Sequence, residues 1–163
     1  MSLTTDPNDP RLGHGVDHEP KQQETAYLVL SEAERSKGFV RPLRLSYRHV
    51  GIPGPGNALR DLTAMEQERY ADAGYVKYEE YPPANGSGAI GRFWTQAQLD
   101  AVGKGCENVT TMARAIAETY AVTPGFYGAT YCCVCMRHRP VGPQGEFTWI
   151  EADGSEAGNR VGA

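Results

Sequence analysis

The stretch Cys132-Cys133-Val134-Cys135-Met136-Arg137-His138 decides how we expect this chain to fold. Cys132 and Cys135 have the C-x2-C spacing, which lets two thiolates bind one ion from a tight turn. His138 follows three residues after the second cysteine. Because cysteine and histidine are the side chains that zinc prefers, the stretch predicts a structural zinc site with a short β-hairpin around it.

A structural zinc ion takes four ligands, so this stretch needs one more from elsewhere in the chain. Cys106 and His49 are the candidates. Cys106 is favoured because it precedes a predicted helix N-terminus, where free amides and the helix dipole stabilise a thiolate. The predicted metal ligands are therefore Cys132, Cys135, His138 and Cys106, with His49 as the open alternative for the last position. If neither reaches the ion, water completes the site and catalysis becomes feasible.

The cysteines also allow an interpretation without metal. Small buried cysteines fill gaps in a core, and His138 is then an ordinary surface residue. Cys133 points away from its neighbours if the chain is extended here, so we expect it to be a core or interface residue and not a ligand. Four cysteines are too few for a disulfide scaffold, and two are adjacent, which favours metal ligation in a reducing compartment.

Length and composition indicate what class of protein this is. The chain has 163 residues, 40% of them hydrophobic and 22% charged, with a formal net charge of −4, as expected for one soluble domain with polar extensions. The acidic balance disfavours a general electrostatic grip on nucleic acid. Arg41, Arg44 and Arg48 form the one candidate basic stripe in the first half, interpreted first as a solvated strand edge and second as a phosphate or partner contact. No apolar run approaches the roughly 20 residues of a membrane span.

Polar segments flank the predicted domain at both ends. Residues 1–24 are polar and contain prolines, so we expect an extended N-terminal arm that only a partner orders. Residues 25–152 are the predicted α+β metal-binding domain, and residues 153–163 a polar C-terminal tail. A second metal site at His14 and His18 is disfavoured, since Gly13 and Gly15 leave no helix to align them.

Local patterns predict a small mixed α+β fold. Alternating apolar residues predict strands over residues 25–30, 39–49, 75–81, 127–131 and 146–150. Capping residues predict helices after Ser31, Thr63 and Thr95, and a longer helix is expected over residues 111–122. Residues 82–91 are rich in turn formers and predict a loop. In this scheme, residues 146–150 return from the cysteine turn and close a ribbon-like hairpin.

The motifs of common enzymes are absent from the sequence. The H-x-E of zinc deaminases is missing from the folded region, as are H-E-x-x-H, G-x-S-x-G and the phosphate-binding G-x-x-x-x-G-K-[ST]. His49 could imitate the histidine base of an HNH-type nuclease, but the second histidine after an asparagine is missing. We therefore expect no catalysis, with a metal-dependent nuclease as the least favoured alternative.

Several segments together resemble a known group of proteins. These segments run from Gly105-Cys106 through Thr119-Tyr120, over Phe126-Tyr127-Gly128-Ala129-Thr130, and over Cys132-x-x-Cys135-x-x-His138-x-Pro140-Val141-Gly142. They resemble uncharacterised small zinc-knuckle proteins of tailed bacteriophages and prophages, over about residues 25–163. The resemblance implies a phage origin, a place in the virion or the bacterial host cytoplasm, and metal binding at Cys132, Cys135 and His138. Glu107-Asn108 departs from the small residues expected after Cys106.

These observations predict a non-catalytic, phage-encoded zinc-binding protein. The leading version is a virion-associated structural or accessory protein, which decorates or stabilises an assembly of capsid or tail proteins. Nine tyrosines and two tryptophans supply rigid surfaces for such contacts. The alternative is a host-directed inhibitor or a nucleic-acid-binding zinc protein. Nucleic acid is not the favoured partner, a membrane is not expected, and a homo-oligomer stays open.

Overall fold

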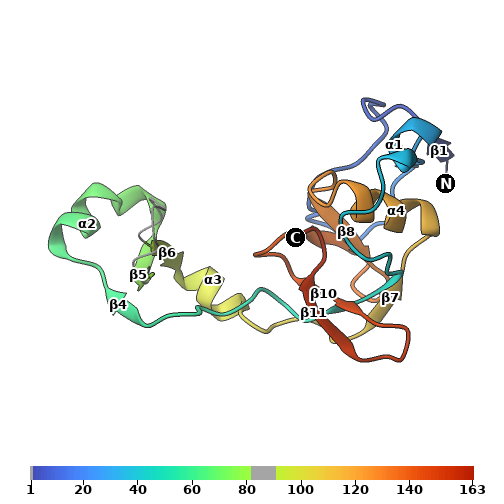
Figure 1. Cartoon of the computed structure of the whole chain (residues 1–163). Coiled ribbons are helices and arrows are strands. Elements are labelled where there is room, and N and C mark those ends of the chain that lie inside the picture. Colours follow the sequence, from blue (N-terminus) through green and yellow to red (C-terminus); the bar gives the residue numbers. More distant parts are fainter. Residues whose placement is uncertain (1, 82–90) are drawn as a thin grey trace. The chain divides into compact units, whose positions relative to one another are not determined.

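The chain forms two compact units, seen in a computed structural model that describes residues 2–81 and 91–163. Unit 1 consists of Met1–Gly51 and Gly105–Ala163, and unit 2 is Ile52–Lys104, drawn green to yellow in Figure 1. The prediction of one domain over residues 25–152 was therefore wrong. Unit 2 is an insertion with a sheet of its own, and a stretch rich in proline and glycine, residues 51–57, lies at its first boundary. The mixed α+β class is confirmed.

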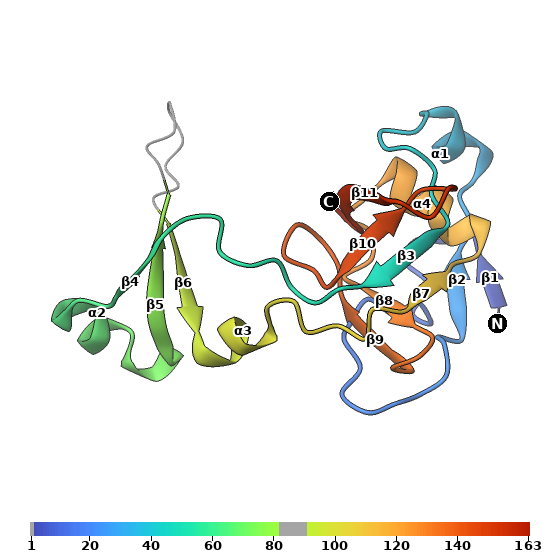
Figure 2. The same cartoon turned by 90° about the horizontal axis from the view of Figure 1, so that it is seen from below.

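An antiparallel sheet of four strands forms the centre of unit 1. Its strands lie in the order β11 (Glu156–Arg160), β10 (Phe147–Ile150), β3 (Ser46–His49) and β7 (Val109–Thr111), and Figure 2 shows β10 beside β3. Tyr47 of β3 packs edge-on against Phe147 and Trp149 of β10. All three rings are at most 7% exposed, so they anchor the hydrophobic core.

The N-terminal segment is part of unit 1, so the prediction of a separate extended arm was wrong. β1 (Ser2–Thr4) pairs in parallel with β2 (Ala26–Leu28), and Leu12 forms a bridge to Ala26. Leu12 is only 8% exposed and belongs to the core. Its burial, together with the strand pairing, holds a polar segment that cannot form a core of its own.

The C-terminal segment is also folded, contrary to the predicted polar tail. β11 pairs with β10 and covers the edge of the sheet. Val161 is fully buried in the core, and Arg160 donates a hydrogen bond of 2.7 Å to the backbone oxygen of Gly51. One buried apolar residue and an open sheet edge are sufficient to order this glycine-rich sequence.

Another sheet of unit 1 is the hairpin that carries three of the four cysteines. β8 (Ala129–Cys132) pairs antiparallel with β9 (Arg137–Pro140), and residues 133–136 connect them. The sequence analysis assigned the return strand to residues 146–150, which was wrong. That segment pairs instead with β3 and β11, because its four buried side chains belong to the main sheet.

Capping residues begin three of the four α-helices in the described part of the chain, as predicted. The helices are α1 (Glu32–Ser36), α2 (Ala64–Arg69), α3 (Gln96–Ala101) and α4 (Arg114–Val122). Ser31 caps α1, while Thr63 and Thr95 form complete capping boxes at α2 and α3. The helix predicted over residues 111–122 starts at Arg114, because Thr111 still belongs to β7.

Unit 2 has a three-stranded antiparallel sheet in the order β4 (Leu59–Asp61), β5 (Tyr75–Glu80) and β6 (Gly91–Thr95), with a short 3₁₀ helix at Ala71–Ala73. Trp94 is fully buried, and its Nε1 donates a 2.9 Å hydrogen bond to the carboxylate of Glu79. Residues 82–90 of the predicted loop lie outside the described residues. In the described ranges, no helix has the length and apolar character to span a membrane.

Candidate metal centre

Four side chains from separate segments of unit 1 meet at one point. They are His49 at the end of β3, Cys106 in the segment before β7, Cys132 at the end of β8, and Cys135 in the β8–β9 loop. Their potential ligand atoms all lie within 4.8 Å of one another. Zinc–sulfur bonds of about 2.3 Å in a tetrahedron place the sulfurs roughly 3.8 Å apart, so the cluster has the dimensions of a zinc site.

The short distances inside the cluster show that the β8–β9 hairpin meets the main sheet of unit 1. Cys106 Sγ lies 3.5 Å from Cys132 Sγ, and Cys135 Sγ lies 3.5 Å from His49 Nδ1. The backbone amide of Cys135 also points at Cys132 Sγ, at 3.4 Å. Amides directed at sulfur stabilise thiolates and are typical of a metal-binding turn.

The backbone after two of these cysteines adopts an unusual conformation. Glu107 follows Cys106 with a φ of 63°, and Met136 follows Cys135 with a φ of 55°. They are the non-glycine residues with positive φ in the described part of the chain. This conformation costs about 1–3 kcal/mol for most residues and persists where the surroundings impose it. Two such residues at one cluster indicate that its geometry is enforced.

Glu146 orients the histidine of the cluster. Its Oε1 lies 2.8 Å from His49 Nε2, and its Oε2 lies 3.2 Å from Arg139 Nε. A hydrogen on Nε2 leaves the lone pair of Nδ1 directed at the cysteines, and the backbone amide of Cys106 points at the same atom, at 3.4 Å. A carboxylate that holds the second nitrogen of a metal-binding histidine is a common feature of zinc sites.

Neighbouring groups keep the carboxylate of Glu146 ionised. Burial would raise the pKa of Glu146, but the hydrogen bond from His49 and the charge of Arg139 hold that pKa below its ordinary value. Burial alone would lower the pKa of His49. The hydrogen bonds of His49 with Glu146 and Cys106 outweigh burial, so the pKa of His49 is raised.

The thiols differ in how readily they ionise. Burial opposes ionisation of Cys106, yet hydrogen bonds from Asn108 and His49 lower its pKa to about 7. The pKa of Cys135 is raised to about 12, mainly by burial. The hydrogen bond with Cys132 and the charge of Cys132 add to this effect. Adjacent thiolates repel one another, so a bound cation would stabilise all of them as ligands.

His138 lies outside this cluster, contrary to its predicted role as a ligand. Its Nδ1 lies 2.6 Å from Asp17 Oδ2, and its ring packs beside Tyr131. The antiparallel register opposes His138 to Tyr131 and turns it away from the cysteines. His49 therefore joins Cys106, Cys132 and Cys135, and the two candidates for the fourth position are both present.

Asp17, Glu24 and His138 form a second group that could hold a metal ion. The ammonium of Lys21 lies 2.9 Å from a carboxylate oxygen of Asp17 and 2.9 Å from one of Glu24. Because Lys21 already supplies a positive charge there, we assign this group to fastening the N-terminal segment on β9.

Other polar residues singled out from the sequence have local roles. Cys133 is exposed, and its backbone amide donates to Thr110 Oγ1 at 3.1 Å. Arg44 pairs with Glu151 at 2.7 Å and Arg48 pairs with Glu156 at 3.3 Å. Two of the three arginines of the stripe therefore already have carboxylate partners within unit 1, and Arg41 donates to the backbone oxygens of Val40 and Ala163, which weakens the case for a phosphate contact.

Replacing Glu146 by glutamine should weaken zinc binding about 10- to 100-fold, because a neutral amide holds His49 less firmly than a carboxylate. Competition with a chromogenic chelator measures this affinity. Glu151→Gln is the matched control, since Glu151 pairs with Arg44 and lies outside the cluster. Wild-type affinity in the Glu146 variant would contradict the orienting role.

Comparison with known proteins adds no further assignment, since no family model, curated protein or solved structure matches this chain. The geometry of the His49, Cys106, Cys132 and Cys135 cluster therefore carries the functional conclusion.

Proposed function

We propose that this chain is a non-catalytic zinc-binding protein in which the ion fastens the β8–β9 hairpin to the main sheet of unit 1. The observation that carries the proposal is the convergence of four ligand atoms within 4.8 Å. Cys132 and Cys135 belong to the hairpin, His49 to the sheet, and Cys106 to the segment leading into it. A tetrahedral site with four protein ligands is closed and serves stability.

The same geometry favours binding over turnover. Four protein ligands leave no coordination position for a water molecule that zinc could activate. Glu146 is the carboxylate beside the cluster, and both of its oxygens are engaged, one by His49 and one by Arg139. A general base is therefore not available at this ion, which makes a metal-dependent nuclease the least supported function.

We further propose the role that the sequence resemblance implies, a phage-encoded accessory protein of the virion that binds capsid or tail proteins. The net charge of −4 and the paired arginines support a protein partner over nucleic acid. The alternative proposal is a host-directed inhibitor or a nucleic-acid-binding zinc protein in the host cytoplasm.

Zinc content is the first test. The purified protein should contain about one equivalent of zinc by elemental analysis, because one closed cluster is present. His49→Gln should lose this zinc, whereas His138→Gln should retain it. No zinc in protein prepared without chelator, or zinc retained by the His49 variant and lost by the His138 variant, would refute the ligand set.

The biological role is tested by mass spectrometry of purified particles and of infected cells. A virion component should appear at fixed copy number in particles, whereas an inhibitor should appear in infected cells alone. Incubation of the zinc-loaded protein with single- and double-stranded nucleic acid tests the catalytic alternative. Zinc-dependent cleavage would overturn the non-catalytic proposal.

A further inference from the structure

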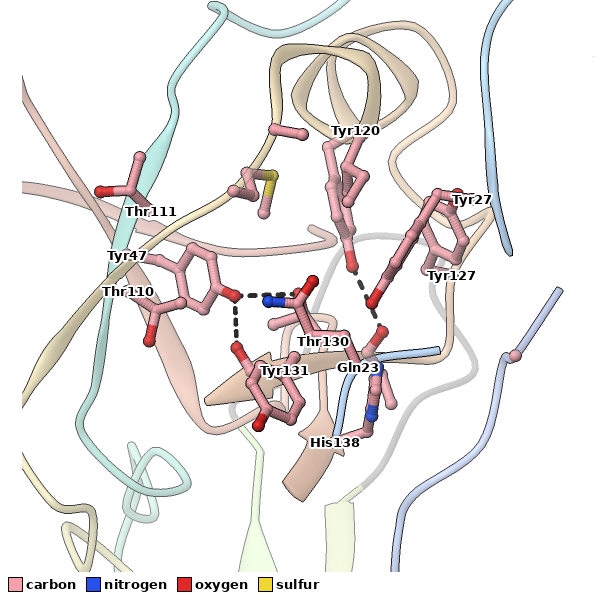
Figure 3. A pocket seen from close by; sticks show the side chains of 15 residues that line it. Gln23, Tyr27, Tyr47, Thr110, Thr111, Tyr120, Tyr127, Thr130, Tyr131 and His138 are labelled. Carbon is pink, nitrogen blue, oxygen red and sulfur yellow. Dashed lines mark hydrogen bonds between the residues drawn. The ribbon is translucent and has the colours of Figure 1, made fainter. Parts of the chain in front are cut away.

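Unit 1 contains a cavity of about 250 Å³ that the metal cluster does not use. It lies among α4, the β8–β9 hairpin, β3 and the N-terminal segment, which contributes Gly13 and Gln23. Figure 3 shows that aromatic side chains surround it, with the hydroxyl ends of Tyr47 and Tyr120 directed into the space between them. Its main lining side chains are Tyr27, Tyr47, Tyr120, Tyr127, Tyr131 and His138.

The lining of this cavity is polar but carries no permanent charge. Among the described residues that form it, none is an aspartate, glutamate, lysine or arginine. Burial raises the pKa of Tyr27 to about 12 and that of Tyr47 still higher, so these phenols are neutral at physiological pH. A charged ligand such as a phosphate or a carboxylate would find no counter-ion in the lining and would lose its hydration.

Some hydrogen-bonding groups of the cavity are already used. The Tyr47 hydroxyl donates to the backbone oxygen of Tyr131, and the Tyr120 hydroxyl donates to that of Ala129 at 3.5 Å. These bonds fix two aromatic walls in place. The cavity is therefore shaped by rings whose positions do not depend on a ligand.

In the described part of the chain, three other side chains that line the cavity retain hydrogen-bonding groups without a partner for every donor or acceptor. Within the described chain, the hydroxyls of Tyr27 and Tyr127 only accept hydrogen bonds, from the backbone amides of Glu24 at 3.3 Å and Leu28 at 3.0 Å. Their hydroxyl hydrogens therefore remain for another acceptor. His138 uses Nδ1 for Asp17, and its Nε2 has no hydrogen-bond partner among the described residues.

We propose that this cavity binds a small uncharged aromatic molecule that carries a hydrogen-bond acceptor and has roughly ten non-hydrogen atoms, given that about 150 Å³ suffices for benzene. The tyrosine rings stack on the ligand or meet it edge-on. The hydroxyls of Tyr27 and Tyr127 donate to its acceptor atom. This site is independent of the zinc cluster and goes beyond the proposed structural role.

Three bicyclic probes test this proposal on the full-length zinc-loaded protein. Coumarin is neutral and has acceptor oxygens, naphthalene has no acceptor, and 2-naphthoate is an anion. Amide chemical shifts in two-dimensional NMR should show saturable binding of coumarin, with shifts around Thr130 and Tyr131. Naphthalene should bind more weakly, and 2-naphthoate should not bind. Equal binding of the anion, or shifts far from the cavity, would overturn the proposal.

Two variants locate the bound probe. Ala113 is exposed at the edge of the cavity, so Ala113→Trp should block entry without disturbing the core, while Ala33→Trp on α1 is the matched control. Tyr27→Phe keeps the ring and should lower coumarin affinity about three- to ten-fold through the lost hydrogen bond. Unchanged coumarin affinity in the Ala113 variant, or no coumarin binding by the wild type, would refute the site.

Discussion

Replacing Cys135 by serine removes the bound zinc and lowers the free energy of unfolding by at least about 3 kcal/mol, because structural zinc sites contribute most of their binding energy to folding. Cys135 is only partly buried, so the loss of its own packing accounts for a small part of this effect. Denaturant unfolding with and without a chelator measures both contributions. The chelator should destabilise the wild type and leave the variant almost unchanged.

Cys133→Ser is the matched control for this prediction. Cys133 lies two residues away in the same loop, is exposed, and remains outside the cluster. Its replacement should change stability by no more than about 0.5 kcal/mol, as for most surface substitutions. Equal losses in the two variants would show that the loop is sensitive to any change, and the ligand assignment would then fail.

The candidate site was predictable where its residues are close in sequence. The C-x2-C spacing of Cys132 and Cys135 predicts that both face one point, and the structure brings them together with Cys106. Proximity was misleading for His138, because hairpin pairing turns its side chain toward Asp17. His49 reaches the cluster through the pairing of β3 with β10, opposite Phe147, and no local pattern reports a register set by such distant residues.

The same distinction, between residues close in sequence and residues brought together by strand pairing, explains which parts of the fold were predicted. Capping boxes at Thr63 and Thr95 are local, and both are present as predicted. Glu146 carried no signal in the sequence, because its importance depends on the position of His49. The return strand of the hairpin was misassigned because β9, with the sequence Arg-His-Arg-Pro, carries no alternating apolar pattern, whereas residues 146–150 do.

The two chain ends show how few residues decide whether a polar segment is ordered. Composition correctly reports that residues 1–24 cannot form a core of their own. Composition does not predict that Leu12 pairs with Ala26, or that Asp17 forms a hydrogen bond with His138. Val161 has the corresponding role at the other end. Burial of single apolar residues against an existing core was the information missing from the sequence.

Replacing Leu12 by alanine should therefore lower the free energy of unfolding by about 2–5 kcal/mol, as for other buried leucines. Leu12 is 8% exposed and packs in the core, whereas Leu3 in the same segment is 55% exposed. Leu3→Ala is the matched control and should cost no more than about 0.5 kcal/mol. Chemical denaturation of both variants measures the difference.

Amide hydrogen exchange on the wild type separates a packed segment from an arm that a partner orders. The backbone amide of Lys21 donates to Met136 at 2.8 Å, and that of Val29 donates to Thr4 at 2.7 Å, so both should be protected in the isolated protein. A fraying segment would leave both amides unprotected and would make the Leu12 and Leu3 variants equally stable. That combined result would restore the extended arm, because Leu12 burial could not then be contributing to the folded state.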